Sequence, residues 1–337
     1  MKKIVSVILC AVLALSCTVF VFASDADDSF GEYEHVFIIG IDGAGAMFGR
    51  EDLNTPNFDR IFADNACRHD AVTEYITTSA QNWGSILTGL SYDVHGFTND
   101  STASEKNTSA SSNHTVFYYV RQAVPDAELV SFCHWSNINK GIIESDIGVK
   151  KVNRGTDPLV VDMIVDYFSS GNAPKLMFVQ LDSVDHAAHT YGGFSDEYYA
   201  AVEKADVYLG DIYDAIYAQG LMDNSLFIVV ADHGETAGGH GGQTKEESSA
   251  VLAVAGHSVN AAELGEGVHN RDVSAITLHA LGIEQPEAFV SSVPADLFGD
   301  SREKTTDPNP MPERLREWRI FFYDFVRMVN ILLSLFD

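Results

Sequence analysis

Aspartate and histidine residues stand in this sequence at points where buried strands should end. The clearest example is LFIVVADHGETAGGHGGQT, residues 226–244, in which an apolar run leads into Asp232 and His233 and a glycine-rich loop then carries His240. An apolar run of this length and composition predicts a buried strand. A carboxylate and an imidazole at a strand end, followed by another imidazole on a loop, are typical of a metal site.

Other predicted strand ends carry groups of the same kind. They are Asp42 after a strand at 35–41, Ser79 after a strand at 70–76, and Asp185 with His189 after a strand at 175–181. Each residue alone would be an ordinary turn, cap or surface residue. Their recurrence favours one shared site, because the carboxyl ends of parallel strands meet at one edge of a sheet, where ligands bind.

The chemistry of these donors restricts the metal. Carboxylates and imidazoles without thiolates suit Zn²⁺, with Mn²⁺ or Mg²⁺ as alternatives. The candidate ligands are more than one tetrahedral site needs. They are Asp42, Ser79, Asp185, His189, Asp232, His233 and His240. We therefore expect two adjacent divalent metal ions, which would clamp the attacking and leaving oxygens of an in-line displacement at phosphorus.

Strand and helix alternate throughout the segments that must position these residues. Further strands are predicted at 128–133 and 250–255, and helices at 57–63, 81–87, 115–123, 159–168, 195–219 and 272–281. We expect a polar loop at 99–113, which reads NDSTASEKNTSASSN. The alternation predicts an α/β fold, with a mostly parallel central sheet and helices on both faces, in one catalytic domain over 34–297.

The two ends of the chain have patterns of their own. Residues 1–23 combine a basic start, an apolar run and a small-residue exit, which predicts a signal peptide, with an uncleaved anchor as the alternative. Residues 311–337 predict an amphipathic helix that would either dock on the domain or contact a membrane surface. We therefore expect a secreted or extracytoplasmic location, with membrane association as an option.

Composition narrows the class of partner. The formal net charge of −27 argues against long nucleic acid, whose phosphates need basic patches. It leaves a small phosphorylated substrate open, because bound metal ions can reverse the local field. If residues 1–23 are removed, Cys67 and Cys133 remain. A disulfide between them and two buried thiols are equally compatible with the sequence.

In their order along the chain, the motifs resemble those of the alkaline phosphatase superfamily, and within it the branch of type I phosphodiesterases/nucleotide pyrophosphatases and related phosphotransferases. The matching motifs are IDG at 41–43, TTSAQNW at 77–83, LTG at 87–89, HG at 95–96, DxxxH at 185–189, ADHG at 231–234 and HGG at 240–242. The resemblance covers about residues 34–282. It implies an alkaline-phosphatase-like sandwich fold.

The resemblance also implies how the ligands divide between the two metal ions. One ion, which contacts the nucleophile oxygen, would be held by Asp42, Asp232 and His233. The other would be held by Asp185, His189 and His240. The alternatives are His257, His269 or His279 in place of His240, and Asp182 with His186 in place of Asp185 with His189.

The nucleophile implied by the resemblance is Ser79, with Thr77 and Thr78 as neighbouring alternatives. Ser79 is predicted to lie near the start of a helix, where a negative oxygen or a phosphate is stabilised. Asn99 resembles the family's phosphate-contacting asparagine, with Asp100 beside it. A phosphoserine at Ser79 would form and then pass its phosphoryl group to water or another acceptor.

We therefore expect a metal-dependent phosphodiesterase or nucleotide pyrophosphatase. The motifs contain no arginine, which favours a singly charged diester unless Arg154 or Arg271 reaches in from a loop. The alternatives are a phosphoethanolamine-type transferase, a sulfatase-like hydrolase and a metal-binding surface protein without catalysis. The sulfatase reading is weakened because SAQNW at 79–83 lacks the proline and arginine of the sulfatase motif.

Overall fold

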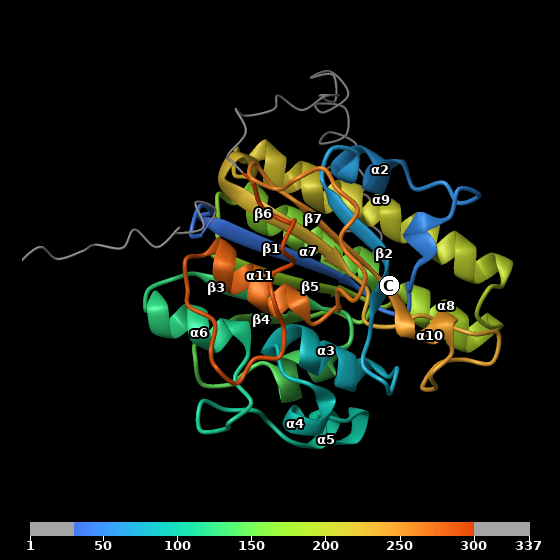
Figure 1. The fold of residues 1–337 in the computed structure, drawn as a ribbon, viewed down its shortest axis with the longest axis horizontal. Coiled ribbons are helices and arrows are strands. Elements are labelled where there is room, and N and C mark those ends of the chain that lie inside the picture. The colour runs from blue at the N-terminus through green and yellow to red at the C-terminus, as the bar shows by residue number, and fades with distance from the viewer. Residues whose placement is uncertain (1–29, 300–337) are drawn as a thin grey trace, which may run out of the picture.

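The computed structural model describes residues 30–299, so the predicted signal peptide at 1–23 and the predicted helix at 311–337 lie outside the described residues. A seven-stranded sheet forms the centre, in the order β2-β7-β6-β1-β5-β3-β4 (Figure 1). The strands are β1 (His35–Ile41), β2 (Ala66–Val72), β3 (Leu129–Cys133), β4 (Lys150–Asn153), β5 (Leu176–Leu181), β6 (Ser225–Val230) and β7 (Ser249–Ala255). Neighbouring strands are parallel except where β7 meets β6 and β2, so the predicted mostly parallel sheet is confirmed.

The central strand, β1, reads HVFIIGI and is buried at every position after its first residue. A strand that is apolar on both faces suits the middle of a sheet covered by helices. β1 pairs in parallel with β5 on one side and β6 on the other, with Ile41 opposite Leu181 and Gly40 opposite Val230. The three strands therefore end side by side, and the residues that follow them meet at one edge.

Helices cover both faces of the sheet, as the alternation predicted (Figure 1). The face that carries Phe37 and Ile39 packs against one helical layer, and the face that carries Val36 and Ile38 packs against another. The first layer contains α2 (Pro56–Phe62), α7 (Asp157–Ser169), α8 (Ser183–Tyr191) and α9 (Asp196–Ala218), and the second contains α3 (Ser79–Thr88), α6 (Val116–Ala123) and α11 (Asp272–Ala280). Across residues 30–299, no helix is both long enough and apolar enough to cross a bilayer.

Some local predictions were wrong. The strand predicted at 70–76 lies at 66–72 instead, because this polar segment owes its conformation to antiparallel pairing with β7 and not to its own pattern. The predicted loop at 99–113 begins with a helix, α5 (Asn99–Ser104). Thr98 caps that helix through a capping box with Ser101. Such a short polar helix has no apolar periodicity by which it could be predicted.

The two cysteines of the described chain are both free. Cys67 lies in β2 and Cys133 in β3, and four strands of the sheet separate them. Neighbouring strands are about 4.8 Å apart, whereas the Cα atoms of a disulfide lie within about 7 Å of each other. The disulfide alternative is therefore excluded.

The short helix α4 (Tyr92–His95) ends on a buried histidine that packs beneath α3. Nδ1 of His95 accepts a hydrogen bond from the Phe97 backbone N–H at 3.0 Å. Nε2 therefore carries the proton of the neutral ring and donates to the Ser85 hydroxyl, 3.0 Å away. Burial lowers the pKa of His95 to about 4, so the ring is a neutral structural element.

This geometry predicts a pH dependence of stability. The unfolded chain binds a proton at His95 near pH 6.5, whereas the folded chain resists it until about pH 4. The contribution of His95 to stability is therefore complete above pH 6.5 and declines as the pH falls toward 4. Between about pH 7.5 and pH 5, the free energy of unfolding of the wild type should fall by about 2 kcal/mol more than that of His95→Gln, measured by urea denaturation. Parallel pH curves for the two proteins would contradict the assignment.

Candidate metal centre

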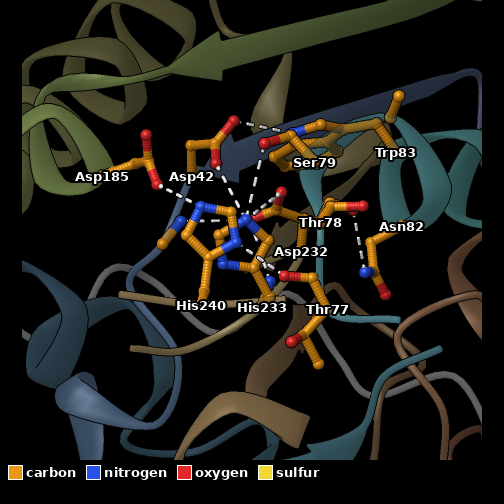
Figure 2. Close-up of polar contacts among 12 residues, drawn as sticks. Asp42, Thr77, Thr78, Ser79, Asn82, Trp83, Asp185, Asp232, His233 and His240 are labelled. Carbon is orange, nitrogen blue, oxygen red and sulfur yellow. Dashed lines mark hydrogen bonds and ion pairs between the residues drawn. The ribbon is translucent and has the colours of Figure 1, made fainter. Parts of the chain in front are cut away.

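Three neighbouring strands of the sheet bring acidic residues to one point. Asp42 follows β1 directly, Asp185 lies in the first turn of α8, which begins just after β5, and Asp232 lies two residues beyond β6. Ser79 is the first residue of α3, on the opposite layer of the molecule. Figure 2 shows these side chains turned toward one another, with His240 completing the group.

The first group of donor atoms centres on His233. Nε2 of His233 lies 3.5 Å from Oδ1 of Asp42, 3.3 Å from Oδ2 of Asp232 and 3.5 Å from Oγ of Ser79 (Figure 2). All four residues are buried. Nδ1 of His233 lies 3.2 Å from the Gly234 carbonyl oxygen, which is only an acceptor. The ring proton therefore belongs on Nδ1, and the lone pair of Nε2 faces the oxygens.

Hydrogen bonds fix both aspartates so that one oxygen of each remains for this centre. Oδ2 of Asp42 accepts from Nε1 of Trp83 at 2.8 Å and from Nε2 of Gln180 at 2.9 Å. Oδ1 of Asp232 accepts from the backbone N–H groups of Gly43 at 3.1 Å and of His233 at 2.9 Å. The remaining oxygens, Oδ1 of Asp42 and Oδ2 of Asp232, are buried without a hydrogen-bond partner.

The second group of donor atoms lies beside the first. Nε2 of His240 lies 3.1 Å from Nε2 of His189 and 3.4 Å from Oδ1 of Asp185, and Oδ2 of Asp185 is 3.5 Å from Nε2 of His189. Nδ1 of His240 donates to the Thr77 carbonyl at 2.6 Å, so its Nε2 also presents a lone pair. The rings of His240 and His233 stack with centroids 3.9 Å apart, which makes the two groups adjacent.

These donor sets fit divalent metal ions. The ligand atoms of Asp42, Asp232 and His233 lie within 4.8 Å of one another, and lone pairs face lone pairs with no hydrogen between them. Burial, reinforced by the neighbouring carboxylates, raises the pKa of Asp42 and of Asp232 well above the usual range. Burial likewise lowers the pKa of His233. A cation in the group would satisfy the orphaned oxygens and reverse each of these shifts.

The structure brings together every residue that the sequence proposed as a metal ligand. It also places Asn99 next to Ser79, because Oδ1 of Asn99 accepts a hydrogen bond from the Ala80 backbone N–H at 3.0 Å. The alternatives lie elsewhere. Asp182 accepts from Gln180, His186 is exposed, His257 stacks on Tyr33, His269 precedes α11, and His279 stacks on Phe298.

The three hydroxyl groups at 77–79 have different surroundings. The hydroxyl of Thr77 donates to the Gly242 carbonyl and accepts from the Gly241 backbone N–H, both at 2.9 Å, so it builds the loop that carries His240. Oγ1 of Thr78 is buried without a partner. Oγ of Ser79 alone has a recorded contact with the first donor group. Which of them attacks a substrate stays a prediction.

One acidic residue of the centre was missed. Glu235 is 2% exposed, and its carboxylate lies within 4.8 Å of ligand atoms of Asp185, His233 and His240. Burial and the charge of Asp185 raise the pKa of Glu235 to about 10. The only signal in the sequence is that Glu235 directly follows the ADHG motif at 231–234. A turn residue after a motif has no periodicity that would reveal its burial.

Two glycines permit the close packing around Asp42. A Cβ atom at Gly43, where φ is +68°, would lie 2.9 Å from Cα and Cβ of Asp185. A Cβ atom at Gly40 would lie 2.4 Å from Cη2 of Trp83, whose Nε1 holds Asp42. The contact between β1 and α3 therefore determines how Asp42 is oriented.

Comparison with known proteins places this geometry in a family. A family model described as type I phosphodiesterase/nucleotide pyrophosphatase matches residues 36–298. The bis(5'-adenosyl)-triphosphatase ENPP4 of Homo sapiens is 24% identical over 253 residues, which cover 68% of this chain and 53% of that protein. The chain thus spans about half the length of the curated relatives that it matches.

Two solved structures show the fold. Murine ectonucleotide pyrophosphatase/phosphodiesterase 5, an inactive form in complex with AMP, superposes with a TM-score of 0.62 at 13% identity, over 79% of this chain and 100% of that chain. A protein in the alkaline phosphatase superfamily from Vibrio parahaemolyticus has a TM-score of 0.58 at 15% identity, over 78% of this chain and 70% of that chain. The predicted alkaline-phosphatase-like fold is confirmed.

The packing of Gly40 against Trp83 predicts a non-additive pair of substitutions. Gly40→Ala should lower the free energy of unfolding by about 1–3 kcal/mol, because the new methyl group meets a buried indole. In a Trp83→Phe background most of that penalty should disappear, since phenylalanine does not extend as far toward β1. Urea denaturation of the two single variants and the double variant measures the coupling. Additive penalties would contradict this contact as the cause.

Proposed function

The chain belongs to the type I phosphodiesterase/nucleotide pyrophosphatase family, and we propose that it is an exported, metal-dependent hydrolase that cleaves phosphodiesters or nucleotide pyrophosphates. The observation that supports this most directly is the convergence of orphaned carboxylate oxygens and imidazole lone pairs on the hydroxyl of Ser79. A hydroxyl beside metal ligands, at a helix N-terminus, is the arrangement that activates a serine toward phosphorus.

Two divalent ions, Zn²⁺ in this proposal with Mn²⁺ or Mg²⁺ as alternatives, would supply Lewis acidity at the phosphoryl oxygens. Their proposed ligands are Asp42, Asp232 and His233 for one ion, and Asp185, His189 and His240 for the other. The hydrogen bonds of Nδ1 in His233 and His240 keep both rings in the tautomer that offers Nε2.

The reaction itself would be carried by the segment at the start of α3. Oγ of Ser79 would attack phosphorus, the bond to the leaving oxygen would break, and water would then hydrolyse the phosphoserine. The helix dipole of α3 stabilises negative charge at this point. Asn99, held against the Ala80 backbone N–H, lies where its side chain would contact an oxygen of the phosphate.

The arginines support a diester as the substrate class. The guanidinium of Arg271 is paired with the buried carboxylate of Glu74 at 2.7 Å. Arg154 contacts the Asn153 carbonyl and the sulfur of Met163. Neither side chain that the sequence offered as a clamp for a dianionic monoester is directed to Ser79 by these contacts. A diester, with a single negative charge, needs no such clamp.

The relatives and the ends of the chain guide the choice of substrate and location. One relative is named a bis(5'-adenosyl)-triphosphatase, and one similar structure holds AMP, so nucleotide pyrophosphates are the first small phosphorylated substrates to test. The pattern at 1–23 supports export, and the amphipathic pattern at 311–337 supports contact with a membrane surface.

Substrate class and metal dependence can be tested together. The purified protein should hydrolyse bis(p-nitrophenyl) phosphate and diadenosine triphosphate faster than p-nitrophenyl phosphate. Chelation should abolish this activity, and Zn²⁺ should restore it, because the buried donors present no alternative catalyst. Parallel turnover of p-nitrophenyl sulfate is the control. Activity that is confined to the sulfate ester, or that resists chelation, would overturn the proposal.

The nucleophile has a matched set of variants. Ser79→Ala should lower kcat for the diester by at least about 10³-fold while both metal equivalents remain bound. Thr78→Ala removes the neighbouring buried hydroxyl and should retain most of the activity. A Ser79→Ala protein with normal turnover, next to an inactive Thr78→Ala protein, would move the nucleophile by one residue.

A further inference from the structure

Glu235 is held with its side chain in the metal centre by the backbone on both sides of it. The Gly234 N–H donates to the Glu247 carbonyl at 2.8 Å. After Glu235, the Thr236 N–H donates to the Gly239 carbonyl at 2.9 Å, and the Thr236 hydroxyl donates to the same oxygen at 2.6 Å. A residue pinned in this way cannot swing its carboxylate out to solvent without unmaking the turn.

The carboxylate of Glu235 has no hydrogen-bond donor. Both of its oxygens are buried without a partner. The imidazoles of His233 and His240 cannot donate to it, because their Nδ1 protons are committed to the carbonyls of Gly234 and Thr77. The buried Tyr198 hydroxyl donates to the Gly43 carbonyl at 2.8 Å. Burying an unpaired carboxylate is costly, so a cation is the remaining means of compensation.

The charge of the centre leads to the same conclusion. Asp42, Asp232, Asp185 and Glu235 contribute four buried or nearly buried carboxylates. Two divalent cations neutralise four carboxylates, whereas they would leave a net positive charge if Glu235 were excluded. Near neutrality favours a site of low dielectric constant, where an excess of either sign is expensive.

We propose that Glu235 is a ligand of the second metal ion, together with Asp185, His189 and His240. The inference rests on the metal centre of the proposed function, but not on its substrate. It changes the second donor set from one carboxylate and two imidazoles to two of each, a set in which additional oxygen donors favour Mn²⁺ or Mg²⁺ more than before. The alternative is that Glu235 holds a proton and donates it to Asp185.

The isosteric substitution Glu235→Gln separates the two roles. A glutamine amide can still donate to Asp185, so a purely hydrogen-bonding residue would leave metal binding unchanged. If Glu235 is a ligand, the variant should lose one of the two metal equivalents after dialysis. By isothermal titration of the apo full-length protein with ZnCl₂, the weaker site should bind at least about 100-fold less tightly than in the wild type.

Glu144→Gln is the matched control. Glu144 is also a fully buried glutamate, but its oxygens accept from the Thr115 N–H at 2.8 Å and the Thr115 hydroxyl at 2.6 Å. This variant should keep both metal equivalents. Wild-type metal affinity in Glu235→Gln would overturn the inference and leave the proposed function standing. A wild-type protein that binds no metal would overturn both.

A second measurement needs no variant. In crystals of the wild-type protein soaked with ZnCl₂, the anomalous peak of the second ion should lie about 2.0–2.2 Å from an oxygen of Glu235. A peak that is coordinated by Asp185 and His240, but lies beyond about 3 Å from both oxygens of Glu235, would contradict the inference even if Glu235→Gln does not fold.

Discussion

The structure depends on holding several carboxylates together where water cannot screen them. Asp42 and Asp232 are almost completely buried, and Asp185 and Glu235 lie against the same group. Burial raises the pKa of Asp42 and of Asp232, and the surrounding carboxylates raise both further. Such a cluster persists only if the surrounding chain imposes it. Its unfavourable electrostatics make a bound cation stabilising, so metal affinity and folding are coupled here.

The fold imposes the cluster through the parallel sheet and one helix. Because β1 lies between β5 and β6, the segments after these strands have to meet at one edge. α3 then adds a second constraint from the opposite layer, since Ser79 and Trp83 lie one turn apart on its surface. Trp83 fixes Asp42 while Ser79 approaches the oxygens that Asp42 and Asp232 leave open, so the same helix orients a ligand and presents a hydroxyl (Figure 2).

The sequence predicted those parts of the molecule whose pattern is set by burial. The apolar runs before Asp42, Asp185 and Asp232 gave the central strands, and with them the edge at which the site lies. It did not predict α8 as a helix, because SVDHAAHTY has little apolar content apart from Val184 and its alanines. Glu235 was missed for a related reason. Its burial results from a turn whose hydrogen bonds are tertiary, and a single acidic residue in a glycine-rich loop is ordinarily exposed.

The nucleophile segment and the second donor group form one structure, and Thr77 joins them. Its carbonyl accepts from Nδ1 of His240, and its hydroxyl bonds the backbone of the next two residues of that loop. From the other side, the amide of Asn82 donates to the carbonyls of Ile76 and Thr78, both at 3.1 Å, and so ties the same segment to α3 (Figure 2). A cation that draws on Nε2 of His240 therefore also steadies the segment that ends at Ser79. This explains why threonine at 77 and asparagine at 82 enclose the hydroxyl at 79: their role is to hold the backbone on which it stands.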